Sequence, residues 1–207
     1  MRCRSCCAWR SGERLSGEPT RRLFFALWPD EGQRAALSQA ARKVLRSCGG
    51  RPVPAENLHV TLAFLGSVPA ARLEELRVIG ARAAAGFPRQ AAPLVLTFGH
   101  LVHFPQAQVL AVLATAEGSA PIGDTRSLAA TLTHETTAAG FTPDLKPFRM
   151  HVTVARKVVR APRARAIRPV AWAFGSFALI ESRTRETGAV YSVVESFVLN
   201  GSEKLRT

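Results

Sequence analysis

The sequence predicts an α+β fold built from two similar lobes, and two observations support this. Strand-like apolar runs and amphipathic helices follow one another in the order β-α-β-α-β-β-α-β-β-β. This mixture of helices and hairpins favours an α+β fold over a doubly wound parallel sheet. The second observation is a repeat, because LHVTLA at residues 58–63 is echoed by MHVTVA at residues 150–155. One copy in each half of a 207-residue chain indicates a duplicated architecture.

The first half of the chain predicts two strand–helix units. An apolar run at 21–29 is a strand, and Asp30 is placed to cap a helix that continues to about residue 47. A second strand is expected at 57–66, followed by an amphipathic helix at 70–86 that begins after a proline and ends at a glycine.

Strands dominate the second half of the chain. The expected strands are apolar runs rich in β-branched residues, at 94–104, 108–115, 146–158, 170–182 and 189–200. A helix is expected at 122–139. Its buried side is expected to comprise Ile122, Leu128, Ala129, Leu132 and Ala139. No glycine-rich phosphate loop is present, which argues against dinucleotide or nucleoside triphosphate binding.

Strand geometry gives the repeated motif a purpose. Side chains of a strand alternate between its two faces, so His59 and Thr61 are expected to share one face while the residues between them enter the core. The same alternation applies to His151 and Thr153. If the two strands lie side by side across a groove, the four polar groups converge.

The residue types in the motif point to phosphoryl chemistry. Histidine exchanges protons near neutral pH, so one imidazole can accept a proton while another donates one. Threonine hydroxyls can donate hydrogen bonds to phosphate oxygens. Arg156, two residues beyond Val154, is expected to alternate onto a useful face and to bind phosphate as a forked donor. Phe64 stands at the equivalent position of the first motif.

The sequence predicts no metal site and no cofactor. No Asp or Glu shares the strand face of either motif, and Glu56 is expected to face solvent. Cys3, Cys6 and Cys7 lie in a tail with no nearby histidine to complete a zinc site. A single histidine in an apolar strand is more often a core residue, but the repeat argues against that interpretation here. The histidines without a repeat partner are expected to be structural or surface groups, namely His100 and His103.

Charge and hydropathy restrict the partners of the protein. The 28 Lys and Arg against 15 Asp and Glu give a formal net charge of +13, which favours a polyanionic partner such as nucleic acid. An arginine-rich surface encoded by a GC-rich gene is the alternative explanation. No apolar stretch of about 18 residues could span a bilayer, and residues 1–20 read as a basic disordered extension without a secretory signal. We therefore expect a cytoplasmic protein that does not interact with membranes, and we expect a monomer.

Four segments together resemble a known family. The motif contexts RPVPAENLHVTLAFLG and KPFRMHVTVARKV, the opening RRLFFALWPD and the closing GAVYSVVESFVL resemble the RNA 2′,3′-cyclic phosphodiesterases. These are LigT-like members of the two-histidine (2H) phosphoesterase superfamily, also called 2′-5′ RNA ligases. The resemblance runs from about Arg21 to Leu199, and it departs from the family at Met150, where such proteins commonly have proline.

The resemblance implies a fold, a reaction and a set of roles. Residues 21–205 would form one domain of two pseudo-symmetric lobes, each a mainly antiparallel sheet with helices outside, around a central groove. His59 would be the proton donor and His151 the proton acceptor, with Thr61 and Thr153 contacting phosphate. The substrate would be RNA with a 2′,3′-cyclic phosphate end, or a cyclic nucleotide, opened to a 2′-phosphomonoester without metal or cofactor.

Two other functions remain open from the sequence. The same site run in reverse would be a 2′-5′ RNA ligase, and the sequence does not separate the two directions. A non-catalytic RNA-binding module is the other alternative, because residues 149–168 are rich in Arg and Lys and contain no acidic residue. That basic segment would otherwise be a solvated loop between strands.

Overall fold

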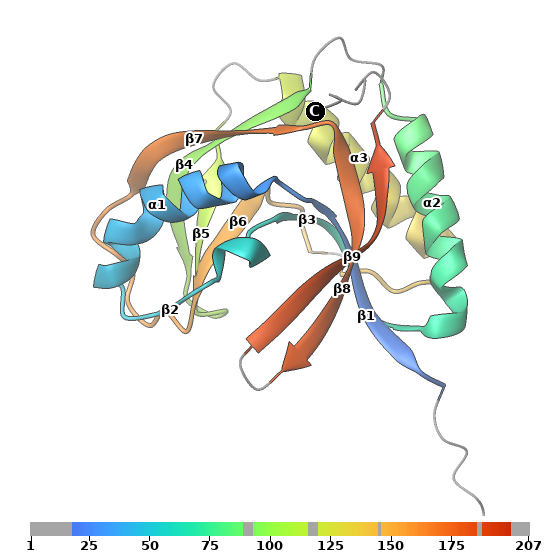
Figure 1. Ribbon diagram of the computed structural model, residues 1–207, viewed down its shortest axis with the longest axis horizontal. Helices are drawn as coiled ribbons and strands as arrows, with labels where there is room; N and C mark the ends of the chain where they lie inside the picture. The colour runs from blue at the N-terminus through green and yellow to red at the C-terminus, as the bar shows by residue number, and fades with distance from the viewer. Residues whose placement is uncertain (1–17, 89–92, 116–119, 145, 186–187, 200–207) are drawn as a thin grey trace, which may run out of the picture.

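The computed structural model describes most of the chain, in the ranges 18–88, 93–115, 120–144, 146–185 and 188–199. The predicted extension lies outside these ranges, apart from its last three residues. The described chain forms two antiparallel sheets with helices packed against them (Figure 1). This confirms the predicted α+β class and the two-sheet architecture.

The first sheet has four strands in the order β3-β1-β8-β9, and every neighbouring pair is antiparallel. Its strands are β1 (Thr20–Leu27), β3 (Val60–Pro69), β8 (Ser176–Arg185) and β9 (Gly188–Val198). Helix α2 (Leu73–Ala85) packs on β8 and β9, while helix α3 (Ala120–Ala138) contacts α2 and β3. Both helices lie on the right of the molecule in Figure 1.

The second sheet has five strands in the order β2-β6-β5-β4-β7, again antiparallel throughout. Its strands are β2 (Arg51–Pro52), β4 (Leu94–Phe104), β5 (Val109–Ala114), β6 (His151–Arg156) and β7 (Ala166–Phe174). Helix α1 (Glu31–Ser47) packs on β6 and β7. Short 3₁₀ turns, η1 (Ala55–Asn57) and η2 (Ala70–Arg72), precede β3 and α2.

The ends of α1 and α2 follow from local sequence. The Asp30 side chain accepts a hydrogen bond from the backbone of Gln33, and the Gln33 side chain accepts one from the Asp30 backbone, which forms a complete capping box. Gly86 is the C-cap of α2. Both boundaries agree with the sequence prediction, except that η2 occupies the first turn expected for α2.

Strand β1 divides its side chains between two environments. Leu23, Phe25 and Leu27 enter the main hydrophobic core, which continues beneath both sheets. Phe24 and Ala26 point the other way, into a small cluster with Ala178 and Ile180 of β8. This second face of the four-stranded sheet carries the residues that approach the histidines.

The predicted strand at 170–182 is wrong in one respect. The run bends at Gly175, and its two halves become β7 in the five-stranded sheet and β8 in the four-stranded sheet. The chain crosses between the sheets there, so one apolar run supplies strands to both lobes. The alternation of side chains is reset at the bend, because Trp172 and Phe174 face the main core in β7 whereas Phe177 and Leu179 face it in β8.

The third helix agrees with its expected core face where that face is described. Leu128, Ala129 and Leu132 are buried, as predicted. Ala139 lies just past the end of α3 and is only partly buried. The side chain of Ile122 lies outside the part that the structure describes.

Candidate active site

The two repeated motifs lie against each other where the sheets meet. His59 directly precedes β3, His151 is the first residue of β6, and β3 contacts β6. A pocket of about 60 Å³ lies between them. It is lined by Val53, Asn57, His59, Thr61, His151, Thr153, Arg156 and Tyr191. The structure thus brings every predicted site residue into one pocket.

Alternation in each motif follows the sequence prediction. Val60 and Val152, which separate histidine from threonine, are fully buried. The two histidines and two threonines are only partly buried, on the pocket side. Met150, the departure from the expected proline, is buried, and its carbonyl accepts a hydrogen bond from the backbone of Ala114 at 3.1 Å. The backbone directly before β6 is therefore hydrogen-bonded to β5 as in a regular sheet.

The imidazoles are held in the same way in both motifs. Nδ1 of His59 lies 2.7 Å from the carbonyl oxygen of Asn57, and Nδ1 of His151 lies 2.6 Å from that of Arg149. A carbonyl only accepts, so Nδ1 carries the proton in each ring, and Nε2 is left to exchange protons. Nε2 of His59 lies 3.1 Å from the hydroxyl of Thr61.

Arg156 reaches the pocket through a β-bulge. Strict alternation would place it with Val154 on the buried face. In the ladder with β5, however, Ala111 pairs with Thr153 and Leu110 with Ala155, so Val154 is an extra residue. The bulge turns Arg156 onto the face of Thr153, where its side chain lines the pocket. The predicted location is right, but simple alternation does not explain it.

The same bulge occurs in the first motif. In the ladder with β1, Ala26 pairs with Thr61 and Phe25 with Ala63, which leaves Leu62 as the extra residue. Phe64 therefore shares the pocket-side face with Thr61, as Arg156 does with Thr153. The two motifs match in backbone geometry as well as in sequence.

Aromatic rings enclose His59. Its ring centroid lies 5.0 Å from that of Phe24, 5.7 Å from Trp28 and 5.2 Å from Tyr191, which meets it edge-on. Burial among these rings lowers the pKa of His59 to about 4, and the positive charge of Arg156 acts in the same direction. The hydrogen bond to the Asn57 carbonyl opposes this shift. His59 is therefore neutral at pH 7.

Tyr191 and Asn57 are pocket residues that sequence reasoning missed. Tyr191, on β9, is the single tyrosine of the chain, and it pairs with Ser182 of β8. Asn57 donates a side-chain hydrogen bond to the carbonyl of Ala189 at 2.9 Å, which ties η1 to the start of β9. Only the register of the β8–β9 hairpin brings Tyr191 to His59. Tyr191 and Asn57 both lie outside the repeated motif, so the repeat does not point to them.

The other candidate groups do not line this pocket. His100 is exposed, while His103 hydrogen-bonds to the carbonyl of Val158 at 2.8 Å, so both fit the surface or structural roles expected of them. Glu56 is exposed, as predicted. Within the described ranges, no three His, Cys, Asp or Glu side chains gather where they could hold a metal ion.

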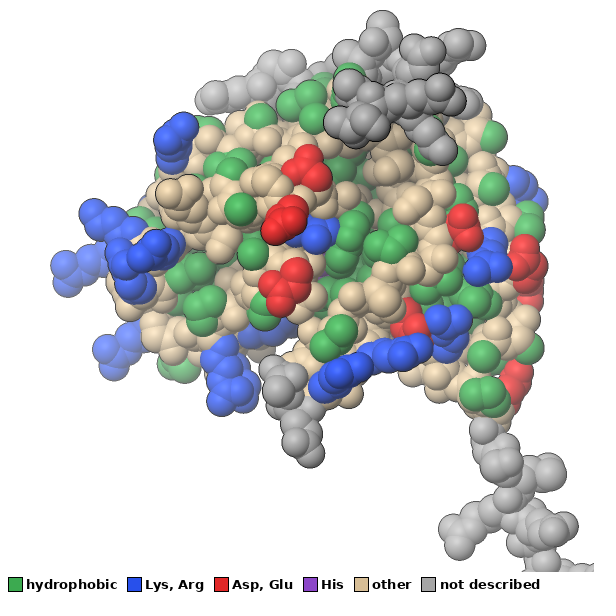
Figure 2. Space-filling model, viewed as in Figure 1, with side chains coloured by type: hydrophobic (Ala, Val, Ile, Leu, Met, Phe, Trp, Pro, Cys, Tyr) green, Lys and Arg blue, Asp and Glu red, His purple; other side chains and the backbone are tan. Residues whose placement is uncertain are grey.

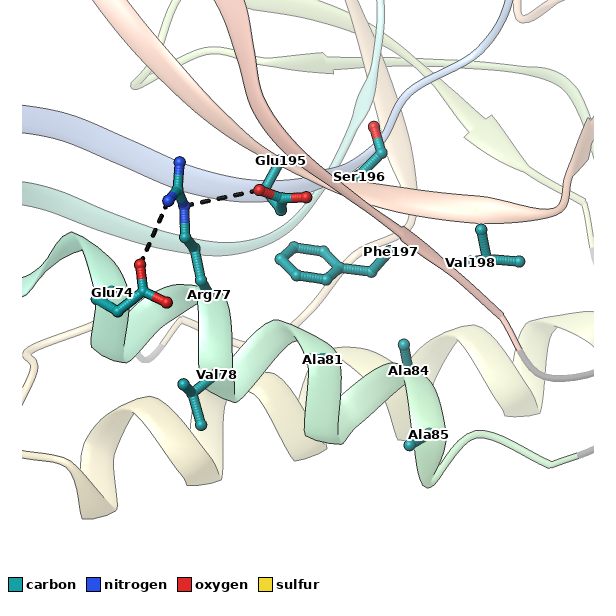
Figure 3. A pocket seen from close by; sticks show the side chains of 10 residues that line it. All are labelled: Glu74, Arg77, Val78, Ala81, Ala84, Ala85, Glu195, Ser196, Phe197 and Val198. Atoms are coloured by element: carbon teal, nitrogen blue, oxygen red, sulfur yellow. Dashed lines mark hydrogen bonds and ion pairs between the residues drawn. The ribbon is translucent and has the colours of Figure 1, made fainter.

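A wider hollow elsewhere contains none of this chemistry. It has a volume of about 620 Å³ and lies between α2 and β9, and none of its lining residues belongs to either motif (Figure 3). Its polar part is an ion-pair cluster in which Arg77 lies 3.3 Å from Glu74 and 3.6 Å from Glu195. Apolar side chains line much of the rest, among them Val78 and Ala84 of α2 and Phe197 of β9. Size therefore does not mark the active site of this chain.

The basic segment predicted at 149–168 is largely on the surface. Arg160, Arg163 and Arg165 are exposed in the connection between β6 and β7. Figure 2 shows Lys and Arg gathered at the left edge of the view, around the end of the molecule where α1 finishes. No helix in the described part of the chain has the length and apolar character needed to cross a membrane.

Comparisons with known proteins agree with this architecture. The family model for LigT-like phosphoesterases matches residues 27–110. A curated RNA 2′,3′-cyclic phosphodiesterase from Thermus thermophilus is 34% identical over 184 residues, which cover 87% of this chain and 91% of that protein.

Solved structures extend the agreement to the fold. A crystal structure of Escherichia coli LigT in complex with 3′-AMP matches with a TM-score of 0.75 and 25% identity, over 87% of this chain and 99% of that one. A crystal structure of a phosphoesterase matches with a TM-score of 0.76 and 24% identity, over 88% and 99% of the two chains.

Fold and sequence similarity together define a phosphoesterase, so the protein is an enzyme of the hydrolase class. The chain belongs to the LigT-like family of 2H phosphoesterases.

Proposed function

We propose that this enzyme opens the 2′,3′-cyclic phosphodiester at RNA 3′ ends to a 2′-phosphomonoester, with His59 and His151 as its acid and base and without a metal. The observation that carries the proposal is the convergence on one pocket of two imidazoles, each held through Nδ1 by the backbone carbonyl two residues earlier. The 34% identity to a Thermus protein named RNA 2′,3′-cyclic phosphodiesterase supports the substrate class. Two imidazoles are among the residues that line the pocket, so its chemistry is suited to proton transfer.

Each step of the reaction has a residue in the pocket. His151 carries its proton on Nδ1, so the Nε2 lone pair can remove a proton from water, which attacks phosphorus in line. Protonated His59 passes its proton to the departing 3′-oxygen, and the phosphate stays on the 2′-oxygen. This division of roles follows the family resemblance, because the two motifs are nearly identical.

Three further side chains are suited to hold the phosphate. Thr61 and Thr153 can donate hydrogen bonds to the non-bridging oxygens, and Arg156 can offer a forked pair of N–H donors. Donors that are already positioned stabilise the charge that builds on these oxygens in the transition state. Nε2 of His59 lies against the Thr61 hydroxyl in this structure. Protonated Nε2 must instead face the departing 3′-oxygen, so the Thr61 hydroxyl must turn from His59 to the phosphate.

The low pKa of His59 makes its protonation depend on the substrate. The ring of His59 is neutral at pH 7, because burial and nearby positive charge disfavour the imidazolium. A bound phosphate brings negative charge beside the ring and offsets the charge of Arg156. His59 therefore becomes an acid when the substrate arrives.

Hydrolysis in the presence of a chelator tests the proposal. Purified protein, a cyclic-phosphate-terminated RNA and excess EDTA are combined, and the products are resolved by ³¹P NMR. A 2′-phosphomonoester is the expected product. A 3′-phosphate, or activity that EDTA abolishes, would overturn the mechanism, while binding without turnover would leave an RNA-binding module. A 2′-5′ linkage formed when a 5′-hydroxyl RNA is added would show that the same site also ligates.

Substitution of each histidine tests the roles. His59→Ala and His151→Ala should each lower kcat by roughly 10²- to 10⁴-fold, because each removes one proton transfer. A substrate with a leaving group that needs no protonation should rescue His59→Ala alone. Rescue of His151→Ala instead would reverse the roles, and near-wild-type rates in either variant would exclude the two-histidine mechanism.

A further inference from the structure

A second hollow opens from the histidine pocket along the four-stranded sheet. It has a volume of about 290 Å³ and shares His59, Thr61, Arg156 and Tyr191 with that pocket. The other residues that line it are Arg22, Phe24, Phe64, Ser182, Thr184 and Ala189. None of these is acidic, and the new polar groups are a guanidinium and two hydroxyls. A polyanion could therefore continue from the reacting phosphate into this hollow.

Arg22 of β1 lines this hollow. Its guanidinium lies over the ring of Phe64, 4.9 Å from the ring centroid. Its neighbour Arg21 is engaged differently, in a 2.5 Å ion pair with the buried carboxylate of Glu181. Arg22 is exposed and has no carboxylate partner in the described part of the chain. Stacking on Phe64 orders its guanidinium and leaves the N–H edge for a ligand.

The duplicated backbone gives this arrangement a counterpart across the groove. Matching bulges place Phe64 in the first motif where Arg156 stands in the second. The first lobe thus has an aromatic ring at the position of the second lobe's arginine, and Arg22 of β1 brings a guanidinium onto that ring. Each lobe consequently presents one arginine toward the groove.

The spacing along β1 suits one nucleotide. Phe24 contacts the ring of His59, and Arg22 lies two residues farther along the same strand face. Two residues of a strand advance by about 7 Å, which is comparable to the reach of one nucleotide unit. A chain whose terminal phosphate lies at the histidines would bring its preceding phosphodiester near Arg22.

We propose that Arg22, held by Phe64, binds the phosphodiester on the 5′ side of the cyclic end, so that the enzyme prefers an oligonucleotide to a cyclic mononucleotide. This proposal rests on the proposed function of the histidine pocket. It names a substrate class and a specificity residue for that site. Arg22 contacts a phosphate that does not react, so its loss should leave the chemistry of the cyclic end unchanged.

Three substrates test the subsite. They are a nucleoside 2′,3′-cyclic phosphate, a dinucleotide that ends in the same cyclic phosphate, and that dinucleotide with an uncharged methylphosphonate linkage. The wild-type kcat/KM should be about tenfold higher for the charged dinucleotide than for the other two, because only it offers a charge-assisted hydrogen bond acceptor to Arg22.

Variants assign this preference to particular side chains. Arg22→Ala should lower kcat/KM about tenfold for the charged dinucleotide and less than twofold for the mononucleotide. Arg22→Lys should keep part of the preference, because it keeps the charge but loses the fork and the stacking. Arg46→Ala, which removes an equal charge from the exposed last turn of α1, is the matched control and should not change the preference.

The outcomes separate this proposal from the proposed function. Turnover of all three substrates at equal efficiency would overturn the subsite and leave the catalytic proposal standing. A dinucleotide preference that survives the methylphosphonate but disappears in Phe64→Leu would also overturn it, because the hollow would then bind a base. No turnover of any substrate by folded wild-type protein would overturn both proposals.

Discussion

Binding of a phosphate diester to the histidine pocket should be accompanied by proton uptake at His59. The pKa of His59 is about 4 in the unliganded protein, so at pH 7 the ring is neutral. Charging it at pH 7 costs about 4 kcal/mol, at about 1.4 kcal/mol for each pH unit above the pKa. This is the free energy that a bound anion must offset before His59 can act as an acid.

A phosphate charge is large enough to do so. One negative charge about 4 Å from the imidazolium contributes about 4 kcal/mol at an effective dielectric constant of 20. The two quantities nearly cancel, which places the pKa of His59 in the complex close to neutrality. At pH 7 we therefore expect roughly half a proton to be taken up for each ligand bound.

Calorimetry in buffers of different ionisation enthalpy measures this uptake. The ligand should be a 2′-deoxynucleoside 3′-methyl phosphate, which cannot react and keeps a single charge throughout the pH range. Between pH 4 and the pKa in the complex, affinity should fall with rising pH by up to tenfold per unit. Below pH 4, or well above the pKa in the complex, His59 should contribute no pH dependence.

Two variants identify the group that takes up the proton. His59→Gln should abolish the uptake, while His151→Gln should retain most of it. An affinity that does not change with pH would refute the reasoning, as would an uptake that disappears only in His151→Gln. Nitrogen chemical shifts of the His59 ring provide an independent check, because the free protein at pH 7 should show a neutral ring protonated at Nδ1.

Three further predictions concern phosphate contacts, stability and long-range charge. Thr61→Val and Thr153→Val should each lower kcat/KM about tenfold, and unchanged constants in both would place the phosphate elsewhere. Hydrogen bonding to Arg21 lowers the pKa of Glu181 from 4.5 to about 2, so the stability that the Glu181 carboxylate contributes is complete above pH 4.5 and is lost as pH falls through 2. The melting temperature of Glu181→Gln should therefore approach that of the wild type near pH 2. A difference in melting temperature that stays constant with pH would contradict this. Affinity for single-stranded RNA should fall as salt rises, at a log–log slope of about −0.7 per phosphate contact. Replacing Arg160, Arg163 and Arg165 together by alanine should make this slope shallower. An equally steep slope in that variant would show that the basic segment does not contact RNA.

Features that depend on a few neighbouring residues could be predicted from the sequence. The capping box at Asp30 uses residues within one turn of α1, so the helix start is visible in the sequence. The faces of His59 and His151 follow from strand alternation over three residues. These local rules place both motifs on the surface of a sheet without any knowledge of the fold.

Features that depend on partners distant in sequence could not be predicted in this way. The apolar run through Gly175 reads as one strand, because apolar character does not say which sheet a strand joins. Tyr191 reaches His59 only through the register of the β8–β9 hairpin. The low pKa of His59 has the same origin, since the rings of Phe24, Trp28 and Tyr191 come from separate segments of the chain.

The bulges connect these two cases. Leu62 and Val154 are both apolar residues directly after a motif threonine, and an apolar residue there fits a regular strand equally well. A regular strand would bury the charge of Arg156 beside Val154, which is strongly unfavourable without a partner. An arginine three residues after the threonine is thus evidence for the bulge, because only the extra residue returns its side chain to the groove. In the first motif Phe64 would be acceptable on either face of the strand, so its residue type does not indicate a bulge. The bulge in the first motif can be inferred only from its sequence similarity to the second motif.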